Sequence, residues 1–388
     1  MPYRLSATRI ARHAFAVIAL AAVGPLVHAA GTVGTGVGTC TEAAFDAALA
    51  GGGAVTFNCG GPATITFTST KSISVGTTIT GSAGIALDGG GTVRLFNVTG
   101  GGLTLANLTL ANGHDTMVNF GAAAIEASAN VSITDSTISG HHTTNGGCPA
   151  IVISGATLTI TRSTITGNVN AAAATGHAVC GNNTATLVIT NSTFAGNTGG
   201  AVSTSGIATI TNSTIAGNSS TGAGNSGGVA VFGPNAVVTL RNTIVANNTD
   251  SGQCQVTDGA ILDGGGNLQF PDAGCGATIA VGDPLLGALA SNGGPTQTMA
   301  IATGSPAIDA AVPANCPATD QRGQGRTDGD GNGSVVCDIG AFEAPTVVIA
   351  PPVFTAVPAL IPSLLALLGL FIAALGAGLV RRRGRGRY

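Results

Sequence analysis

Oxygen-bearing side chains near the end of the chain have the spacing of a metal site. Three of them occupy alternate positions in TDGDGNGS (327–334), namely Asp328, Asp330 and Asn332. Carboxylate and amide oxygens at this spacing begin the calcium loop of an EF-hand. The twelfth position is Ile339, where that loop has Glu, so the EF-hand form fails. Asp338 or Glu343 would have to complete the shell, so the segment is either a Ca²⁺ site or a polar loop.

Residues suited to cleaving a glycosidic bond are few. A lyase needs clustered carboxylates for calcium and a basic residue that removes a proton. A hydrolase needs carboxylates that face one another across the bond. The nearest approach to such a cluster is the trio Asn112, His114 and Asp115, although NGHD also fits an ordinary turn. His141 and His142 form a second candidate metal site, and we assign no catalytic residue.

Eight cysteines indicate an oxidising compartment and structural disulfides. They fall into neighbouring pairs 19 to 32 residues apart: Cys40 with Cys59, Cys148 with Cys180, Cys254 with Cys275, and Cys316 with Cys337. Eight cysteines allow about 105 pairings, so this connectivity is a hypothesis. No C-x-x-C occurs, which argues against a zinc ribbon or a thioredoxin-like motif.

A recurring phrase shows which elements must position these residues. Its six copies are LTLANLTLANG (103–113), VSITDSTISGH (131–141), LTITRSTITGN (158–168), LVITNSTFAGN (187–197), ATITNSTIAGN (208–218) and VTLRNTIVANN (238–248). Their starts lie 28, 27, 29, 21 and 30 residues apart. Apolar residues alternate in each copy, as in a strand, until a turn-forming residue. We predict that such corner asparagines stack and bond along the coil, as a ladder of Asn107, Asn191, Asn212 and Asn242.

The fold class that follows is all-β, a right-handed parallel β-helix solenoid. Two further short apolar runs follow the first in each repeat, and three strands with three corners make one rung. Thr, Ser, Val, Ile, Gly and Asn dominate the composition, with 61 Gly, no Trp and 8% charged residues, which suits pleated strands and tight turns. The length predicts roughly eleven rungs. A β-sandwich is the alternative, whereas 44% hydrophobic residues and a net charge of −3 argue against disorder.

Both ends of the chain predict export. Three arginines precede an apolar stretch and small residues at Ala29 and Ala30, the pattern of a secretory signal peptide. Residues 356–380 carry no charge and precede five arginines, which predicts a transmembrane helix with its basic end in the cytoplasm. The alternatives are a retained N-terminal anchor and a buried core helix. Phe45 and Leu49 in TEAAFDAALA (41–50) have helical spacing, so we expect a short helix that caps the first coil.

Several motifs resemble known families of bacterial surface proteins. The rung pattern resembles right-handed parallel β-helices of the pectate-lyase-like superfamily. GGAV (199–202) and FAGN (194–197) are similar to polymorphic outer-membrane protein repeats. A longer series resembles the choice-of-anchor Q domain: NTIVANN, GGGNLQF (264–270), DPLLGALASNGGPTQTMAIATGSPAIDA (283–310), DQRG (320–323) and CDIGAFE (337–343). The resemblance implies a sorting tail, and VPAL (357–360) looks like an IPTL-type or exosortase-type tail in which Ala359 replaces the usual Thr.

The predicted organisation has seven parts. They are a signal peptide (1–29), an N-terminal cap (30–60), the parallel β-helix (61–280), a choice-of-anchor Q-like region (281–343), a linker (344–357), a transmembrane helix (358–380) and a basic cytoplasmic tail (381–388).

The favoured function is that of an envelope-anchored, surface-exposed β-helix with an adhesin-like or structural role and without catalysis. Its expected partners are the membrane, a glycan or another surface ligand, and a sorting enzyme that acts on the tail. The alternative is a polysaccharide lyase or glycoside hydrolase of this fold. Residues 31–380 carry 17 acidic and 6 basic side chains, a net charge of −11, which argues against nucleic-acid binding. Apart from Ca²⁺, we expect no cofactor.

Overall fold

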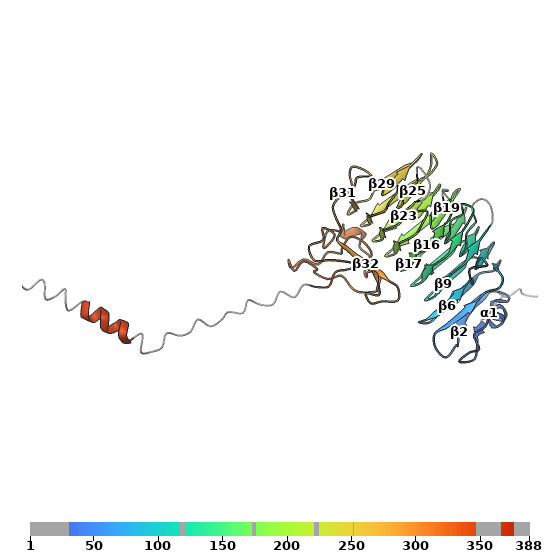
Figure 1. The fold of residues 1–388 in the computed structure, drawn as a ribbon, viewed down its shortest axis with the longest axis horizontal. Helices are drawn as coiled ribbons and strands as arrows, with labels where there is room; N and C mark the ends of the chain where they lie inside the picture. Colours follow the sequence, from blue (N-terminus) through green and yellow to red (C-terminus); the bar gives the residue numbers. More distant parts are fainter. Residues whose placement is uncertain are drawn as a thin grey trace, which may run out of the picture. The chain divides into compact units, whose positions relative to one another are not determined.

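The protein is a parallel β-solenoid of about nine turns (Figure 1). The computed structural model describes residues 31–116, 121–172, 176–220, 225–250, 252–346 and 366–375. Within these residues, three parallel sheets run along the coil and a short fourth sheet lies at one corner. Each strand pairs in register with the strand one rung before it, so every rung repeats the path of the last.

The first two sheets each have ten strands among the described residues. Sheet A consists of β1 (Gly31–Val33), β2 (Gly53–Phe57), β5 (Thr77–Thr80), β8 (Leu103–Ala106), β12 (Val131–Thr134), β16 (Thr157–Thr161), β20 (Thr186–Thr190), β23 (Ile207–Thr211), β26 (Val237–Arg241) and β29 (Ala260–Asp263). Sheet B consists of β3 (Ala63–Thr66), β6 (Ile85–Asp88), β9 (Thr109–Ala111), β13 (Thr137–Ser139), β17 (Thr164–Thr166), β21 (Thr193–Ala195), β24 (Thr214–Ala216), β27 (Ile244–Ala246), β30 (Leu268–Phe270) and β31 (Ala280–Val281).

The remaining strands form one further long sheet and two small ones. Sheet C consists of β4 (Lys71–Ile73), β7 (Phe96–Val98), β11 (Ile125–Ala127), β15 (Ile151–Ser154), β19 (Val179–Asn182), β22 (Val202–Thr204), β25 (Val229–Val231) and β28 (Cys254–Val256). Sheet D consists of β10 (His114–Asp115), β14 (His142–Thr143) and β18 (Val169–Asn170). Outside the coil, β32 (Leu286–Ala290) and β33 (Thr298–Ile301) form an antiparallel pair, followed by a 3-10 helix at Pro313–Asn315.

The corner between sheets A and B uses the left-handed backbone conformation in every copy of the phrase. The predicted corner asparagines Asn107, Asn191, Asn212 and Asn242 have φ of 55°, 48°, 43° and 47°. Asp135 and Arg162 take the same place in their rungs, with φ of 50° and 47°. Asn tolerates this region better than most residues, because its short polar side chain bonds locally. The turn-forming residue of the phrase therefore sets the bend from sheet A into sheet B.

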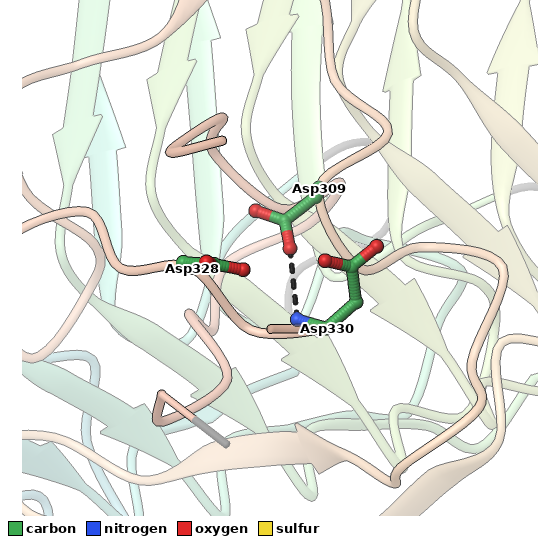
Figure 2. A group of neighbouring side chains, drawn as sticks. All are labelled: Asp309, Asp328 and Asp330. Atoms are coloured by element: carbon green, nitrogen blue, oxygen red, sulfur yellow. Dashed lines mark hydrogen bonds between the residues drawn. The ribbon is translucent and has the colours of Figure 1, made fainter. Parts of the chain in front are cut away.

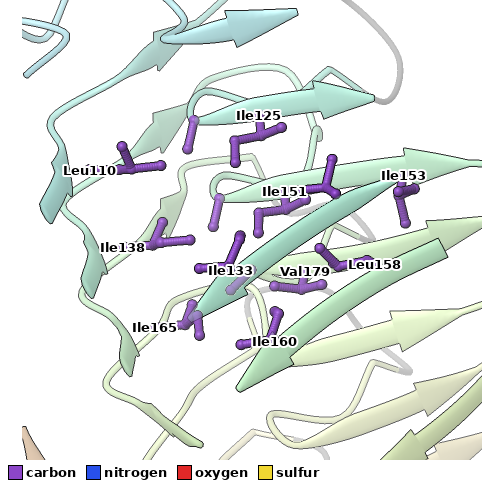
Figure 3. Close-up of a cluster of buried hydrophobic side chains, with 14 of the residues drawn as sticks. Leu110, Ile125, Ile133, Ile138, Ile151, Ile153, Leu158, Ile160, Ile165 and Val179 are labelled. Atoms are coloured by element: carbon purple, nitrogen blue, oxygen red, sulfur yellow. The ribbon is translucent and has the colours of Figure 1, made fainter. Parts of the chain in front are cut away.

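The interior of the coil is filled by one aliphatic residue from each strand position that points inward. In the middle rungs these side chains come from all three long sheets and interdigitate, as Ile133, Ile138 and Ile151 do in Figure 3. All three are fully buried. Burial of a side chain of this size stabilises a fold by about 1.5–3 kcal/mol, so the stacked rungs supply a continuous core.

A short helix lies at the start of the coil. The helix expected at 41–50 is observed as α1 (Glu42–Leu49), which Thr41 caps by accepting a hydrogen bond from the Ala44 N–H. Phe45 is fully buried and its ring lies 5.0 Å from that of Phe67. The helix packs so closely on β1 that a Cβ at Gly31 would lie 2.4 Å from the Ala48 carbonyl oxygen. Strands β1 and β2 already belong to sheet A, so the coil begins inside the predicted cap segment.

Residues 282–346 leave the coil and fold back against its side. Their apolar side chains pack on outward-facing residues of sheet B, where Ile244 and Leu268 join one buried cluster with Ile301 and Phe342. The estimate of roughly eleven rungs was therefore too high. Because this region adds a lateral layer and no further turns, about nine rungs are formed.

The C-terminal residues 348–388 form a second unit, in which a helix with exposed side chains covers 366–375. Among the described residues, no helix has the length and apolar character needed to span a membrane. The predicted signal peptide (1–29), the basic tail (381–388), the remainder of the predicted span (358–380) and most of the linker (344–357) lie outside the described residues.

Candidate functional site

Three carboxylates meet in the lateral region, two of them from the predicted metal loop. Asp328 and Asp330 are joined by Asp309, and one ligand oxygen from each lies within 4.8 Å of the others (Figure 2). Asp309 comes from SPAIDA and has a left-handed backbone, with φ of 52°. Sequence reasoning missed it because nothing in its spacing relates it to the DGDGN segment.

The loop closes on itself through its carboxylates. Asp328 accepts hydrogen bonds from the N–H groups of Gly331, Asn332 and Gly333, at 2.7, 3.1 and 2.8 Å. The Asn332 side chain donates to Asp330 at 2.8 Å, and its oxygen accepts from the Ser334 N–H. The structure thus places Asp328 and Asp330 in the acidic group, whereas the Asn332 amide bonds within the loop.

The two carboxylates proposed to complete the shell have other partners. Asp338 is buried and accepts from the N–H groups of Asp309 and Ala344. Its burial, reinforced by Glu343 and Asp309, raises its pKa to about 7. Glu343 is paired with Arg326 at 2.7 Å. These groups brace the region behind the loop.

The Ca²⁺ prediction has a direct test. Bound calcium would relieve the repulsion among three close carboxylates and raise the unfolding temperature by mass action. Adding Ca²⁺ to chelator-treated protein should raise that temperature, and Asp328→Ala should abolish the rise. If wild type unfolds at the same temperature with and without chelator, the loop is a polar turn without an ion.

A second charged cluster forms where sheets C and D meet. Arg94 is 10% exposed and pairs with both Asp115 and Glu126. Its Nε also donates to the Ala122 carbonyl at 2.6 Å. Two carboxylates are thus brought together, but one guanidinium neutralises both. Sequence reasoning found Asp115 and missed Arg94 and Glu126, which lie on neighbouring rungs.

The predicted trio at 112–115 is not assembled into one site. Asn112 donates to Asp88 at 2.8 Å, Asp115 pairs with Arg94, and His114 Nδ1 contacts the Gly91 carbonyl at 2.9 Å. The histidine pair is also divided. His142 packs edge-on against His114, with ring centroids 5.2 Å apart, whereas His141 is buried.

A ladder of buried amides runs along the coil, one position away from the predicted one. It joins the asparagine that ends each Gly-Asn or Asn-Asn corner: Asn168, Asn197, Asn218 and Asn248, followed by Gln253. Each Asn Nδ2 donates to the next amide oxygen at 2.8–3.0 Å and to a carbonyl of the preceding rung. All members are thereby satisfied within the core.

The predicted corner ladder is mainly a set of anchors for the lateral region. One direct bond along it is formed, from Asn242 Nδ2 to Asn212 Oδ1 at 3.1 Å. Asn191 instead donates to the Thr319 carbonyl, and Asn212 to the Asp338 carbonyl. The corner positions were predicted correctly, but most of their bonds lead out of the coil, to residues that sequence spacing does not relate to them.

Four disulfides join the cysteines in the predicted pairs: Cys40–Cys59, Cys148–Cys180, Cys254–Cys275 and Cys316–Cys337. The described residues contain no free cysteine. Cys148 and Cys180 belong to successive rungs and link the segment before β15 to β19. This usage indicates a secreted or extracellular protein.

The fold and these sites define the chain as a disulfide-stapled parallel β-solenoid with a laterally packed C-terminal region. No family model, curated protein or solved structure matches it. The resemblances to pectate-lyase-like β-helices, polymorphic repeats and the choice-of-anchor Q domain therefore stay predictions from the sequence motifs.

Proposed function

We propose that this protein is a β-helix displayed on the outer side of a bacterial envelope, where it binds a surface ligand and catalyses no reaction. The observation that carries this proposal is the state of its carboxylates. All 17 acidic residues lie in the described part of the chain. Where carboxylates meet on the coil, a buried cation neutralises them: Lys71 pairs with Glu42 and Asp46, and Arg94 pairs with Asp115 and Glu126. Paired carboxylates of this kind are poor general acids and bases.

Envelope attachment rests on the sequence of the C-terminal unit. The uncharged segment 358–380 and the arginines of 381–388 have the pattern of a membrane anchor with a cytoplasmic tail. The choice-of-anchor resemblance adds a sorting enzyme that would act near 357–360. Four disulfides support an oxidising location for the coil.

Membrane fractionation with mass spectrometry of the mature C-terminus tests display. The full chain should enter the membrane fraction and be cleaved by protease added to intact cells. A chain that ends at residue 357 should appear in the soluble exported fraction with its disulfides formed. Recovery of the full chain from the cytosol with reduced cysteines would contradict the proposal.

A polysaccharide lyase or glycoside hydrolase remains the second candidate, because of the Arg94 cluster. Glu126 is 37% exposed, on the outer face of sheet C, and is therefore accessible to a bound sugar. Incubation with pectin, alginate and neutral glycans would reveal catalysis as new unsaturated or reducing ends. If such ends form with wild type and are lost in Glu126→Gln, the coil is an enzyme and the binding role fails.

A further inference from the structure

The outer face of sheet C contains a recess of about 470 Å³. This volume is within the range of about 300–1,000 Å³ found for small-molecule sites. It lies over β19 and β22, and its lining includes Asn182, Ser203 and Phe232. It is the best-formed hollow among the described residues, and none of the sites discussed above uses it.

The recess exists because one rung is short. The rung from Asn191 to Asn212 is 21 residues long, whereas its neighbours have 29 and 30. The missing residues come from the connection that precedes β22, which is only 199–201, against 171–178 before β19 and 220–228 before β25. The outer face of β22 is therefore left uncovered between two rungs with longer connections.

The strand register explains the shape of the recess. One outward row reads Val152, Cys180, Ser203 and Ala230, and the next reads Ser154, Asn182, Ser205 and Phe232. Small side chains form the floor on β19 and β22, and the Phe232 ring stands at one end. That ring packs edge-on against His177, with centroids 6.4 Å apart. The Cys148–Cys180 disulfide holds the other side across two rungs.

The chemistry of the lining specifies an uncharged polar ligand. No Asp, Glu, Lys, Arg or His lines the recess within the described residues, so an ion would lose its hydration without gaining a counter-charge. Asn182 and Asn183 each offer amide donors and an acceptor, and Ser203 offers a hydroxyl that otherwise makes a weak bond to Cys180 Sγ at 3.3 Å. Phe232 offers an apolar face. A ring with hydroxyls at its edge and C–H groups on its face matches both features.

We propose that this recess binds a neutral pyranose unit of a surface glycan, with the sugar face against Phe232 and its hydroxyls on Asn182 and Ser203. The inference rests on the proposed display function and names the ligand class for it. Uronic acids and other charged sugars are excluded by the same lining.

Titration calorimetry with the detergent-solubilised full chain tests the site. The probes are maltohexaose and cellohexaose as neutral glycans and hexagalacturonate as the acidic comparator. We expect a neutral hexasaccharide to bind and the acidic one not to bind. Ser203→Phe fills the recess and should abolish binding, whereas Thr239→Phe places the same side chain on the outer face of sheet A and should leave it unchanged. Asn182→Ala, a milder change, should weaken binding by about tenfold, the effect of losing about 1.4 kcal/mol.

The other outcomes separate the site from the function. Binding that survives Ser203→Phe would overturn the recess as the site, and Ser203-dependent binding of hexagalacturonate would overturn the ligand class. If no glycan binds, yet cells displaying the protein adhere to a glycan-free protein surface, the recess proposal fails and display with adhesion stands. If the chain never reaches the cell surface, the display function itself fails.

Discussion

His141 shows how one residue type replaces another in the core of the coil. It lies where the following rungs have the ladder asparagine, and its ring makes the same bonds as their amide. Nδ1 accepts from the Gly113 N–H at 2.9 Å, so Nε2 carries the proton and donates to the Leu110 carbonyl at 3.1 Å. The neutral ring is held in a fully buried site, and burial lowers its pKa to about 4.

This substitution makes stability depend on pH. The unfolded chain protonates His141 near pH 6.5 and the folded chain only near pH 4, so stability should fall as the pH drops through this window, by up to about 3 kcal/mol. His141→Asn restores the residue of the other rungs and should remove that loss. Thermal unfolding of both proteins at pH 7 and pH 4.5 measures it. An equal acid effect in both proteins would contradict the assignment.

The amide ladder makes a second residue-level prediction. Asn218 accepts from the backbone and side chain of Asn197 and donates to Asn248 and to the Phe194 carbonyl. Asn218→Ala would leave buried groups on both neighbouring rungs without partners, so we expect a loss of about 2–4 kcal/mol. Urea unfolding measures the loss. Thr209→Ala, on the outer face of sheet A, is the control and should change stability by less than about 0.5 kcal/mol.

Which asparagine forms the ladder could not be read from the phrase. Both asparagines recur in register, and both suit corners. The difference is that the side chain of Asn218 points into the coil, whereas that of Asn191 points toward a segment 128 residues away. Local spacing predicts where the backbone bends, but the direction of each amide depends on what packs outside the bend.

At the scale of elements, the N-terminal helix closes the first rung through one aromatic side chain. Phe45 fills the end of the coil, and the single lysine of the chain fixes the helix by pairing with Glu42 and Asp46. Phe45→Ala should cost about 3–5 kcal/mol locally and uncover the edge of β1, where a second chain can pair. Light scattering after size exclusion should then detect oligomers. Leu49→Ala, on the half-buried side of α1, should remain in the wild-type oligomeric state.

The lateral region contains a carboxylate whose titration opposes that of His141. Burial raises the pKa of Asp338 to about 7, so the folded chain holds this proton more tightly than the unfolded chain does. Stability from this group is complete below about pH 4 and is lost as the pH rises to about 7, by a few kcal/mol. Asp338→Asn should flatten this decline. Limited proteolysis of residues 282–346 at pH 5 and pH 8 measures it, and an unchanged pH difference in the variant would refute the assignment.

At the scale of the whole molecule, the solenoid was predictable and its lateral layer was not. Strand period, corner residues and cysteine spacing all lie within one repeat, so they could be read from neighbouring sequence. The lateral region depends on contacts between residues more than 120 positions apart, such as Asn212 with the Asp338 carbonyl. The same distance hid Asp309 from the predicted metal loop and Glu126 from Arg94. Long-range side-chain contacts leave no periodic signal in one sequence.

Gln321 shows how the lateral region is joined to the coil. It is fully buried and accepts from the Thr193 hydroxyl at 2.6 Å. Its Nε2 lies 2.9 Å from the Thr164 and Thr296 hydroxyls. One amide therefore links the outer faces of β17 and β21 to residues 282–346. Each rung of a solenoid contacts mainly its neighbours, whereas this layer spans several rungs at once.

Gln321→Leu should detach the layer and leave the coil folded. The lost bonds strand several buried hydroxyls, which should cost about 2–3 kcal/mol, most of it from docking. Limited proteolysis should then cleave 282–346 before the rungs, while circular dichroism keeps the strand signal. Gln255→Leu, on the outer face of β28, is the matched control and should be cleaved like wild type. If Gln321→Leu instead unfolds coil and layer in one transition, the layer is part of a single cooperative unit and the rungs depend on it.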